Sequence, residues 1–548
     1  MSRRNGGAED GSSISGPASV WGGFGVSANR TVLAIAILGF VFATMPVVAQ
    51  EQVFRINNTA EPESLDPGVV TGVPEHRILS NLFEGLTTTD PKDLSPRPGM
   101  ASSWSVSNDG LVYTFKLRDA RWTDGKPVTA QDFLYAWERV LNPKMGAKYA
   151  QQLFYLRNGE DYNKGRITDF SQVGVKALDD KTLQATLRCP TAYFLDLTSF
   201  YTLYPVPRWA LEAHGKDWVK PGKIVSNGSF RLVSWVPQRE LILEKNPQHW
   251  DAASVKLQKV IFLPTDDINT AYKQFLAGDS DWIPTVPPAQ LDSARNRPDY
   301  YVSPYLGTYY FRVNVTKPPL NDVRVRKALS MAVDRESLTK FVTKAGEIPS
   351  GTFVPGGMRG YEGVRGLGFD VAGAKKLLAE AAYPDGKGFP KVELLYNTNE
   401  LHRVVTQAVQ QMWKEHLGIQ VELANVEWKV YLARQGSLDY QVSRAGWIGD
   451  YVDPNTFLDM WITGGGNNQT GWSSKRYDEL IGQAACKIVN ARDRMRALQE
   501  AEKILVAEEV PILPLFTYVN KGMLSRRVKG WSPNILDQHP LKYINLER

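Results

Sequence analysis

The chain has 548 residues, 43% hydrophobic and 22% charged, a balance typical of a globular protein with about three folding units. The net charge of +6 includes no run of Lys or Arg, which excludes the basic patch of a nucleic-acid-binding protein. The only cysteines, Cys189 and Cys486, form no CxxC motif, which excludes a zinc knuckle or a thioredoxin-type site.

Residues 1–49 are predicted to be a leader and a signal peptide. Arg30 precedes an apolar run over residues 32–42, and Val47-Val48-Ala49 is a small-residue cleavage pattern. The run is too short to span a bilayer comfortably, and no later stretch is long and apolar enough. We expect cleavage near Gln50 and, because no Cys follows it, a periplasmic protein without a lipid anchor.

The rest of the chain alternates strand and helix patterns. A Thr129–Asp132 capping box opens one helix, since the Thr hydroxyl and the acid satisfy free backbone N–H groups. The expected strands cover residues 52–56, 112–117, 392–396 and 420–423. Three further helices are expected: one begins at Asp322, a second begins near Glu400, and a third includes Leu498. This alternation predicts an α/β fold.

Motifs for common catalytic chemistry are missing from the sequence. The six His are scattered and none forms HExxH, and there is no GxSxG elbow, phosphate loop or Rossmann fingerprint. We therefore expect a binding protein with no catalytic residues, no metal and no cofactor. A periplasmic hydrolase with a site assembled from distant residues stays as an alternative.

Four stretches carry a resemblance to a known family. They are residues 122–133 (WTDGKPVTAQDF), 227–230 (NGSF) with 244–250 (EKNPQHW), 321–329 (NDVRVRKAL) and 443–451 (SRAGWIGDY). In type, order and spacing they resemble the periplasmic oligopeptide-binding proteins of ABC peptide importers, solute-binding protein family 5. The resemblance runs from about residue 52 to the end of the chain.

The resemblance implies a two-lobed periplasmic binding protein fold of type II, in the large peptide-binding class, with an additional domain in the first lobe. Closure over the ligand is expected to be a hinge motion near Gly307 and Val519. The first lobe is expected to comprise residues 50–84, 208–306 and 520–548, the additional domain 85–207, and the second lobe 307–519.

The resemblance also assigns the peptide-binding residues. Asp450 matches the anchor of the peptide ammonium, and Arg444, His402 and, less directly, Arg434 match cations that hold the peptide carboxylate. The positions that match backbone-pairing residues are Val73, Gly446 and Ile448, and those that match cleft-lining aromatics are Tyr149, Tyr310, Trp428, Trp447 and Tyr518.

Three departures from the family pattern accompany these matches. Thr71 replaces an acidic residue of close relatives, and Thr343 stands where relatives have a Lys. Gly307 and Ile448 occupy positions where some relatives have a linked cysteine pair. Contacts at the first two positions are therefore expected to differ from those in the family.

The implied function is that of a monomeric extracytoplasmic receptor. It would bind short peptides and deliver them to the permease subunits of an ABC transporter in the inner membrane. Alternatives with the same fold bind dipeptides, cell-wall peptides, haem, nickel or opine-like compounds, and a chaperone-like binder of unfolded chains is a further one. Cys189 and Cys486 are expected to stay unpaired, because the family layout puts them in different lobes and a bond would hinder closure.

Overall fold

The computed structural model describes residues 52–547 except 192, 357, 359 and 487–489, so the predicted signal peptide lies outside the described residues. Its central element is an eleven-stranded mixed sheet in the order β15-β14-β16-β12-β17-β11-β1-β10-β9-β8, with β13 beside β17. The strands are β1 Val53–Asn57, β8 Phe230–Val236, β9 Glu240–Lys245, β10 Lys259–Leu263, β11 Trp282–Ile283, β12 Tyr300–Val313, β13 Ile348–Pro349, β14 Val392–Asn397, β15 Val421–Val426, β16 Val442–Ile448 and β17 Ile512–Leu524.

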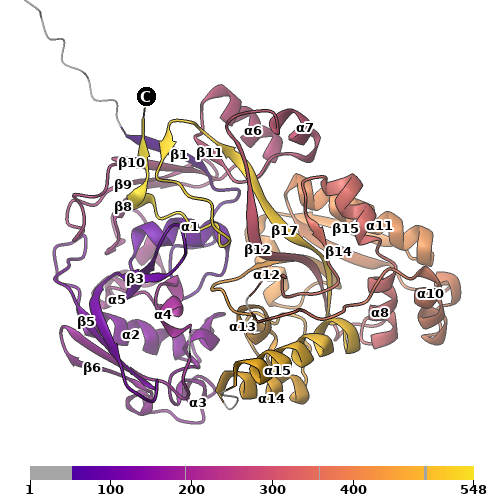
Figure 1. Ribbon diagram of the computed structural model, residues 1–548, viewed down its shortest axis with the longest axis horizontal. Helices are drawn as coiled ribbons and strands as arrows, with labels where there is room; N and C mark the ends of the chain where they lie inside the picture. Colours follow the sequence, from indigo (N-terminus) through magenta and orange to yellow (C-terminus); the bar gives the residue numbers. More distant parts are fainter. Residues whose placement is uncertain (1–51, 192, 357, 359, 487–489, 548) are drawn as a thin grey trace, which may run out of the picture. The chain divides into compact units, whose positions relative to one another are not determined.

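Two long strands, β12 and β17, connect the two ends of this sheet (Figure 1). Their antiparallel register runs to Pro304↔Val519, is interrupted, and resumes at Thr308↔Thr517. We call residues 52–304 with 519–547 the first half, and residues 308–517 the second half. The lobe boundary predicted near residue 307 falls close to this interruption.

Each half has its own helices. In the first half they are α1 Val73–Leu82, α2 Ala130–Leu141, α3 Gly159–Asn163, α4 Phe194–Leu197, α5 Arg208–His214, α6 Ile268–Ala277 and α7 Leu291–Ala294. In the second half they are α8 Val323–Met331, α9 Arg335–Ser337, α10 Val371–Glu380, α11 Glu400–Leu417, α12 Trp428–Gly436, α13 Asn455–Leu458, α14 Lys475–Cys486 and α15 Ala491–Lys503. The predicted α/β class is confirmed.

Within the range predicted for the additional domain lies a separate antiparallel sheet, β4-β5-β7-β6. The exact boundaries of that domain stay a prediction. The strands outside the large sheet are β2 Thr87–Thr89, β3 Pro96–Pro98, β4 Ala101–Val106, β5 Val112–Leu117, β6 Val175–Asp179, β7 Thr182–Thr186, β18 Val528–Lys529 and β19 Asn545–Leu546.

The predicted helix starts are confirmed by their hydrogen bonds. Thr129 and Asp132 form both bonds of the capping box at the start of α2, and the Thr129 N–H donates to the Asp132 carboxylate at 2.8 Å. The Asp322 carboxylate caps α8 by accepting from the Arg324 N–H at 2.8 Å. Such caps satisfy N–H groups that have no partner inside the helix, so they fix where each helix begins.

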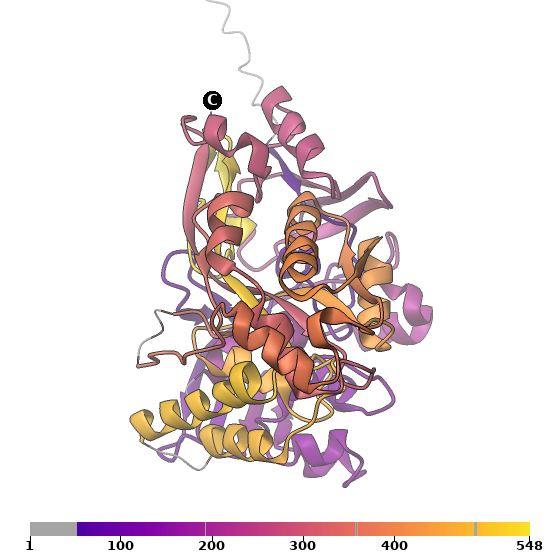
Figure 2. The ribbon, with the colours of Figure 1, turned by 90° about the vertical axis from the view of Figure 1, so that its right-hand side faces the viewer.

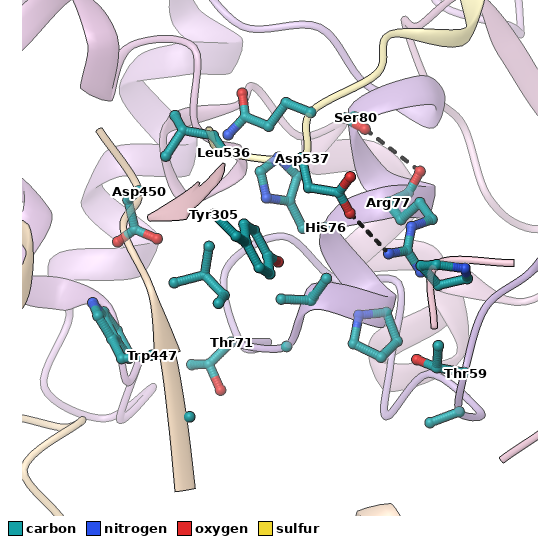
Figure 3. A pocket seen from close by; sticks show the side chains of 18 of the residues that line it. Thr59, Thr71, His76, Arg77, Ser80, Tyr305, Trp447, Asp450, Leu536 and Asp537 are labelled. Carbon is teal, nitrogen blue, oxygen red and sulfur yellow. Dashed lines mark hydrogen bonds and ion pairs between the residues drawn. The ribbon is translucent and has the colours of Figure 1, made fainter. Parts of the chain in front are cut away.

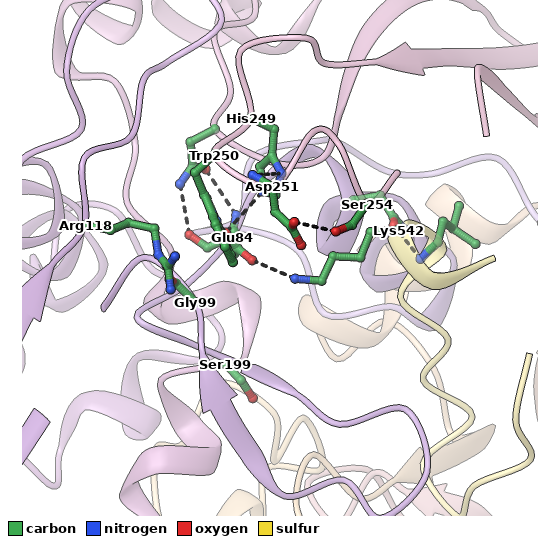
Figure 4. Close-up of polar contacts among 12 residues, drawn as sticks. Glu84, Gly99, Arg118, Ser199, His249, Trp250, Asp251, Ser254 and Lys542 are labelled. Carbon is green, nitrogen blue, oxygen red and sulfur yellow. Dashed lines mark hydrogen bonds and ion pairs between the residues drawn. The ribbon is translucent and has the colours of Figure 1, made fainter. Parts of the chain in front are cut away.

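A buried polar cluster holds the C-terminal segment to the first half (Figure 4). The Glu84 carboxylate accepts from the Trp250 indole N–H at 2.6 Å and lies 3.3 Å from both His249 and the Lys542 ammonium. Burial alone would raise the pKa of Glu84, but Lys542 and His249 lower it to about 2. The ion pair of Glu84 and Lys542 therefore connects two residues that are more than 450 positions apart in the chain.

The expectation that the two cysteines stay unpaired is wrong. Cys189 and Cys486 form a disulfide, with their Cα atoms 5.0 Å apart, inside the usual range for such bonds. The end of α14 lies against the loop that carries Cys189, whose sulfur is also 3.2 Å from the Ala485 carbonyl oxygen. The two cysteines do belong to different halves, as the resemblance implied. They are nevertheless bonded to each other, so the disulfide joins the first half to the second.

Along the described part of the chain, no helix is both long and apolar enough to cross a membrane.

Candidate functional site

A cavity of about 340 Å³ lies between the two halves and is lined by residues of both. Ten of the twelve predicted ligand-binding residues line it, and Figure 3 shows part of the wall, including Trp447 and Asp450. The ten are Val73, Tyr149, His402, Trp428, Arg444, Gly446, Trp447, Ile448, Asp450 and Tyr518.

Strand β16 supplies the largest share of these residues. It pairs with β12 from Val442 to Ile448, whereas its register with β14 covers only Val442 and Ser443. After Ser443 the strand β14 no longer pairs with this edge. The Arg444 carbonyl oxygen accepts from the Tyr431 hydroxyl at 2.6 Å and the Gln435 amide at 3.1 Å, and the stretch beyond it, with Gly446 and Ile448, lines the cavity. An unpaired strand edge presents N–H and C=O groups that an extended chain can pair with.

Gly446 allows close packing at this edge. A Cβ atom there would lie 2.5 Å from the Tyr518 hydroxyl and 3.2 Å from a terminal nitrogen of Arg444. Gly307 and Ile448 face each other in the β12–β16 register, so the two positions of the lost cysteine pair are cross-strand neighbours. A Cβ at Gly307 would lie 2.3 Å from the Ile448 side chain.

Asp450 lies just beyond β16, and its hydrogen-bond partners in the described part of the chain are neutral. Its carboxylate accepts from the Tyr149 hydroxyl at 3.3 Å and from the Gln152 amide at 3.0 Å, both in the first half. Burial, followed by the negative charge of Asp459, raises its pKa well above the ordinary value. A cation placed beside Asp450 would stabilise the ionised carboxylate.

Arg444 is a buried cation at the other end of the same strand. One terminal nitrogen donates to the Tyr518 hydroxyl at 2.9 Å and the other to the Asn397 side-chain oxygen at 3.3 Å. The guanidinium lies over the ring of Tyr309, 4.9 Å from its centre, and its Nε has no hydrogen-bond partner. These partners are neutral, so the charge of Arg444 is available to an anion in the cavity.

His402 lies in the first turn of α11 and is buried. Burial and the neighbouring Arg444 lower its pKa well below the ordinary value, so the imidazole is neutral at pH 7. Its Nδ1 is also without a partner. A neutral imidazole can donate or accept a hydrogen bond, but it does not act here as a second cation.

Trp428 bridges the cavity. Its indole N–H, at the start of α12 in the second half, is 3.4 Å from the Glu75 carboxylate of α1 in the first half. Burial raises the pKa of Glu75 to about 7. Tyr149 and Trp447 also meet across the cavity, with ring centres 6.0 Å apart.

Two predicted residues do not line the cavity. Tyr310 is fully buried on the opposite face of β12, against Phe353 and Trp461, because successive side chains of a strand point to opposite faces. Arg434, on α12, pairs with Glu393 at 2.7 Å and Asp439 at 3.1 Å outside the cavity. For Tyr310 the predicted cleft position is therefore wrong, and the weak match noted for Arg434 does not bring it to the cavity wall.

The two substituted positions differ from each other. Thr71 lines the cavity, where a hydroxyl replaces the acid of relatives. Thr343 is fully buried outside it, and its hydroxyl donates to the Glu347 carboxylate at 2.7 Å. The departure at Thr71 therefore changes the cavity wall, whereas the departure at Thr343 does not.

The sequence reasoning missed a charged group on the first-half wall. The Arg77 guanidinium is 3.7 Å from the Asp537 carboxylate and 5.0 Å from the centre of the Trp282 ring (Figure 3). Asp537 also accepts from the Asn520 amide at 2.5 Å and lies 2.8 Å from the ring nitrogen of His539. No motif marked these residues, because they come from a helix interior, a strand end and an irregular C-terminal segment.

Comparison with known proteins gives a consistent family. Residues 95–469 match the middle region of the bacterial extracellular solute-binding proteins, family 5. The chain is similar to the oligopeptide-binding protein OppA of Bacillus subtilis, with 38% identity over 490 residues, covering 87% of this chain and 89% of that protein. It is also similar to the structure of Haemophilus influenzae OppA in complex with RPPGFSPFR, with a TM-score of 0.86, 32% identity and coverage of 91% and 99%.

A third relative bears on the arrangement of the halves. The structure of the Escherichia coli murein tripeptide-binding protein MppA matches with a TM-score of 0.86 at 35% identity, covering 91% of this chain and 99% of that one. The unliganded open form of MppA matches with a TM-score of only 0.59 at the same identity, covering 91% and 98%. The halves of the present chain are therefore arranged as in the first of these structures and not as in the open form.

Proposed function

Since the chain belongs to the bacterial extracellular solute-binding proteins of family 5, we propose that it is a receptor for short peptides, which it delivers to an ABC importer. The observation that carries this proposal is the free edge of β16, with the carboxylate of Asp450 at one end and the guanidinium of Arg444 at the other. A peptide offers a backbone for the edge and opposite charges for the two ends.

The binding mode follows from these groups. Asp450 holds the ammonium, Arg444 holds the carboxylate, and residues along β16 pair with the peptide backbone. This backbone pairing does not depend on the peptide's sequence. Because Arg434 is already paired with acids, the carboxylate is left to Arg444, with hydrogen bonds from His402. The resemblance to the family implies peptides of about two to five residues, which in an extended conformation advance about 3.3 Å per residue.

Closure of two lobes over the peptide completes the site. The hinge lies near Gly307 and Val519, where the register of β12 and β17 is interrupted. Tyr149 and Gln152 reach Asp450 from the first half, so both halves build the proposed ammonium site. Support comes from the relatives, since Haemophilus influenzae OppA has been solved in complex with a peptide and Escherichia coli MppA in an unliganded open form.

The working compartment is the periplasm, after removal of the signal peptide near Gln50, and the receptor acts there as a monomer without a lipid anchor. Its partner is the permease of the importer in the inner membrane. N-terminal sequencing of periplasmic material tests the cleavage site, and an intact leader there would reject it.

Binding without hydrolysis is tested on the purified mature protein. Isothermal titration calorimetry with peptides of two to five residues should show saturable binding, and mass spectrometry should recover the same peptides intact after prolonged incubation. Mass spectrometry of the molecules that co-purify then gives the preferred length. Steady release of cleavage products, or co-purification of a non-peptide ligand with no titratable peptide binding, would overturn the proposal.

A further inference from the structure

The Cys189–Cys486 disulfide lies in a larger contact between the halves, which we call the clasp. In the first half the clasp comprises residues 155, 189–191 and 193. In the second half it comprises residues 451–459, 484–486 and 490–494. It is separate from the strands β12 and β17, the only other covalent connection between the halves in the described chain. The proposed function uses neither cysteine.

The second-half side of the clasp is held rigidly. Arg494 on α15 makes a two-pronged ion pair with Asp453, at 2.8 and 2.9 Å. The Nε of Arg494 also donates to the Ala484 carbonyl oxygen at 3.0 Å, which fixes the end of α14 next to Cys486. A planar guanidinium that bonds two groups at once orients both of them.

Non-covalent contacts continue the clasp from the disulfide toward the cavity. The rings of Tyr193 and Tyr451 stack across the halves with centres 4.5 Å apart. The Tyr155 hydroxyl accepts from the Asn455 amide at 2.7 Å and donates to the Asp459 carboxylate at 3.0 Å. Within the first half, the Arg188 N–H donates to the Tyr155 carbonyl oxygen at 2.8 Å, and the rings of Tyr155 and Tyr193 meet edge to face with centres 5.4 Å apart. Each side of the disulfide is therefore packed into its own half.

Two bodies joined at two separate places have restricted relative motion. They can still rotate about the line through the two covalent connections. Any other relative movement must stretch or bend one of these connections. Figure 1 shows α14 and α15 below the strands β12 and β17, so the two connections lie in different parts of the second half. Opening is then largest at contacts far from that line that are held only by hydrogen bonds.

We propose that the Cys189–Cys486 disulfide is a second hinge point, which keeps the clasp closed while the halves rotate and limits how far the cavity opens. This inference rests on the proposed movement of the halves, but not on the identity of the ligand. The bond that was expected to obstruct closure instead selects the direction of opening.

The test compares the oxidised wild type with Cys189→Ser, Cys486→Ser and the double variant. Small-angle X-ray scattering of the ligand-free proteins should give a larger radius of gyration for all three variants than for the wild type. Because loss of either sulfur breaks the same bond, the three variants should agree with one another. Different values for the two single variants, or a double variant equal to their sum, would indicate lost packing at each site and would overturn the proposal.

Reduction of the wild type provides an independent arm. A dithiol such as dithiothreitol gives two electrons and two protons to the two sulfurs and becomes a cyclic disulfide, leaving two Cys thiols. The wild type should then acquire the scattering of the variants, whereas Cys189→Ser should not change. A non-reducing peptide map should show the Cys189–Cys486 crosslink before reduction, and free thiols in protein from an oxidising compartment would refute the inference.

Peptide dissociation separates this inference from the proposed function. Stopped-flow measurements should show faster dissociation in the three variants by one common factor, because release needs opening. If no peptide binds, the proposed function fails, and the scattering comparison still tests the second hinge point. If peptides bind and both scattering and dissociation are equal in the oxidised wild type and the variants, only the hinge point fails.

Discussion

Replacing Asp450 by Asn should weaken peptide binding by removing one charge at almost constant shape. Among the described residues, the Asp450 carboxylate accepts hydrogen bonds from the neutral groups of Tyr149 and Gln152, and burial raises its pKa. In the proposed binding mode, the peptide ammonium is the cation that compensates this carboxylate, and in the closed cavity it loses its own water. Truncating one partner of such a buried charge pair costs about 2–5 kcal/mol.

At about 1.4 kcal/mol per decade, this cost corresponds to a roughly 30- to 4,000-fold weaker peptide affinity, measured by calorimetry at pH 7. N-terminal acetylation of the peptide should weaken binding to the wild type by a similar factor, since it deletes the same pair from the other side. The two losses should not add, because they remove one interaction.

The matched control is Asp439→Asn, which removes an exposed acid at the end of α12 outside the cavity. It should leave the affinity within about twofold, in line with the small effects of exposed charges. Equal binding of acetylated and free peptides by the wild type would refute the reasoning, because Asp450 would then not hold the ammonium.

Three further predictions concern the same cavity. A bound ammonium favours the ionised form of Asp450, so peptide binding should release a proton. Affinity should therefore rise as pH increases from about 4 through the raised pKa of Asp450 in the free protein. Calorimetry in buffers of different ionisation enthalpy measures the proton release, and Asp450→Asn should abolish both the release and the pH dependence. The wild type should bind C-terminally amidated peptides about 30-fold or more weakly than free acids, whereas Arg444→Met should not distinguish the two, with Arg434→Met as the control outside the cavity. Gly446→Ala puts a Cβ 2.5 Å from the Tyr518 hydroxyl and should reduce affinity by about tenfold or more, whereas the control Gly436→Ala, with nothing within 4 Å of its Cβ, should not.

The sequence was most informative where neighbouring residues determine the structure. The cap at Thr129 and Asp132 and the α/β alternation depend on local hydrogen bonds and on the period of apolar residues, which can be read along the chain. The resemblance was most useful at β16, because one short stretch brings Arg444 and Asp450 to the cavity.

The failures come from contacts between distant segments. The sequence contains Tyr309 and Tyr310 side by side, and only the register of β12 decides which face each ring takes. Cys189 and Cys486 are 297 positions apart, so their proximity depends on how α14 packs on the first half. Arg77 and Asp537 meet for the same reason, and no local pattern announces such pairs.

The contact between Trp428 and Glu75 has a spectroscopic consequence. The indole and the carboxylate belong to opposite halves and lie 3.4 Å apart across the cavity. When the halves separate, the indole exchanges this partner for water, so its emission should shift to longer wavelength, and peptide binding should reverse the shift. The protein thus carries a fluorophore in the wall of its own cavity, and the difference between wild type and Trp428→Phe isolates that signal from the other tryptophans.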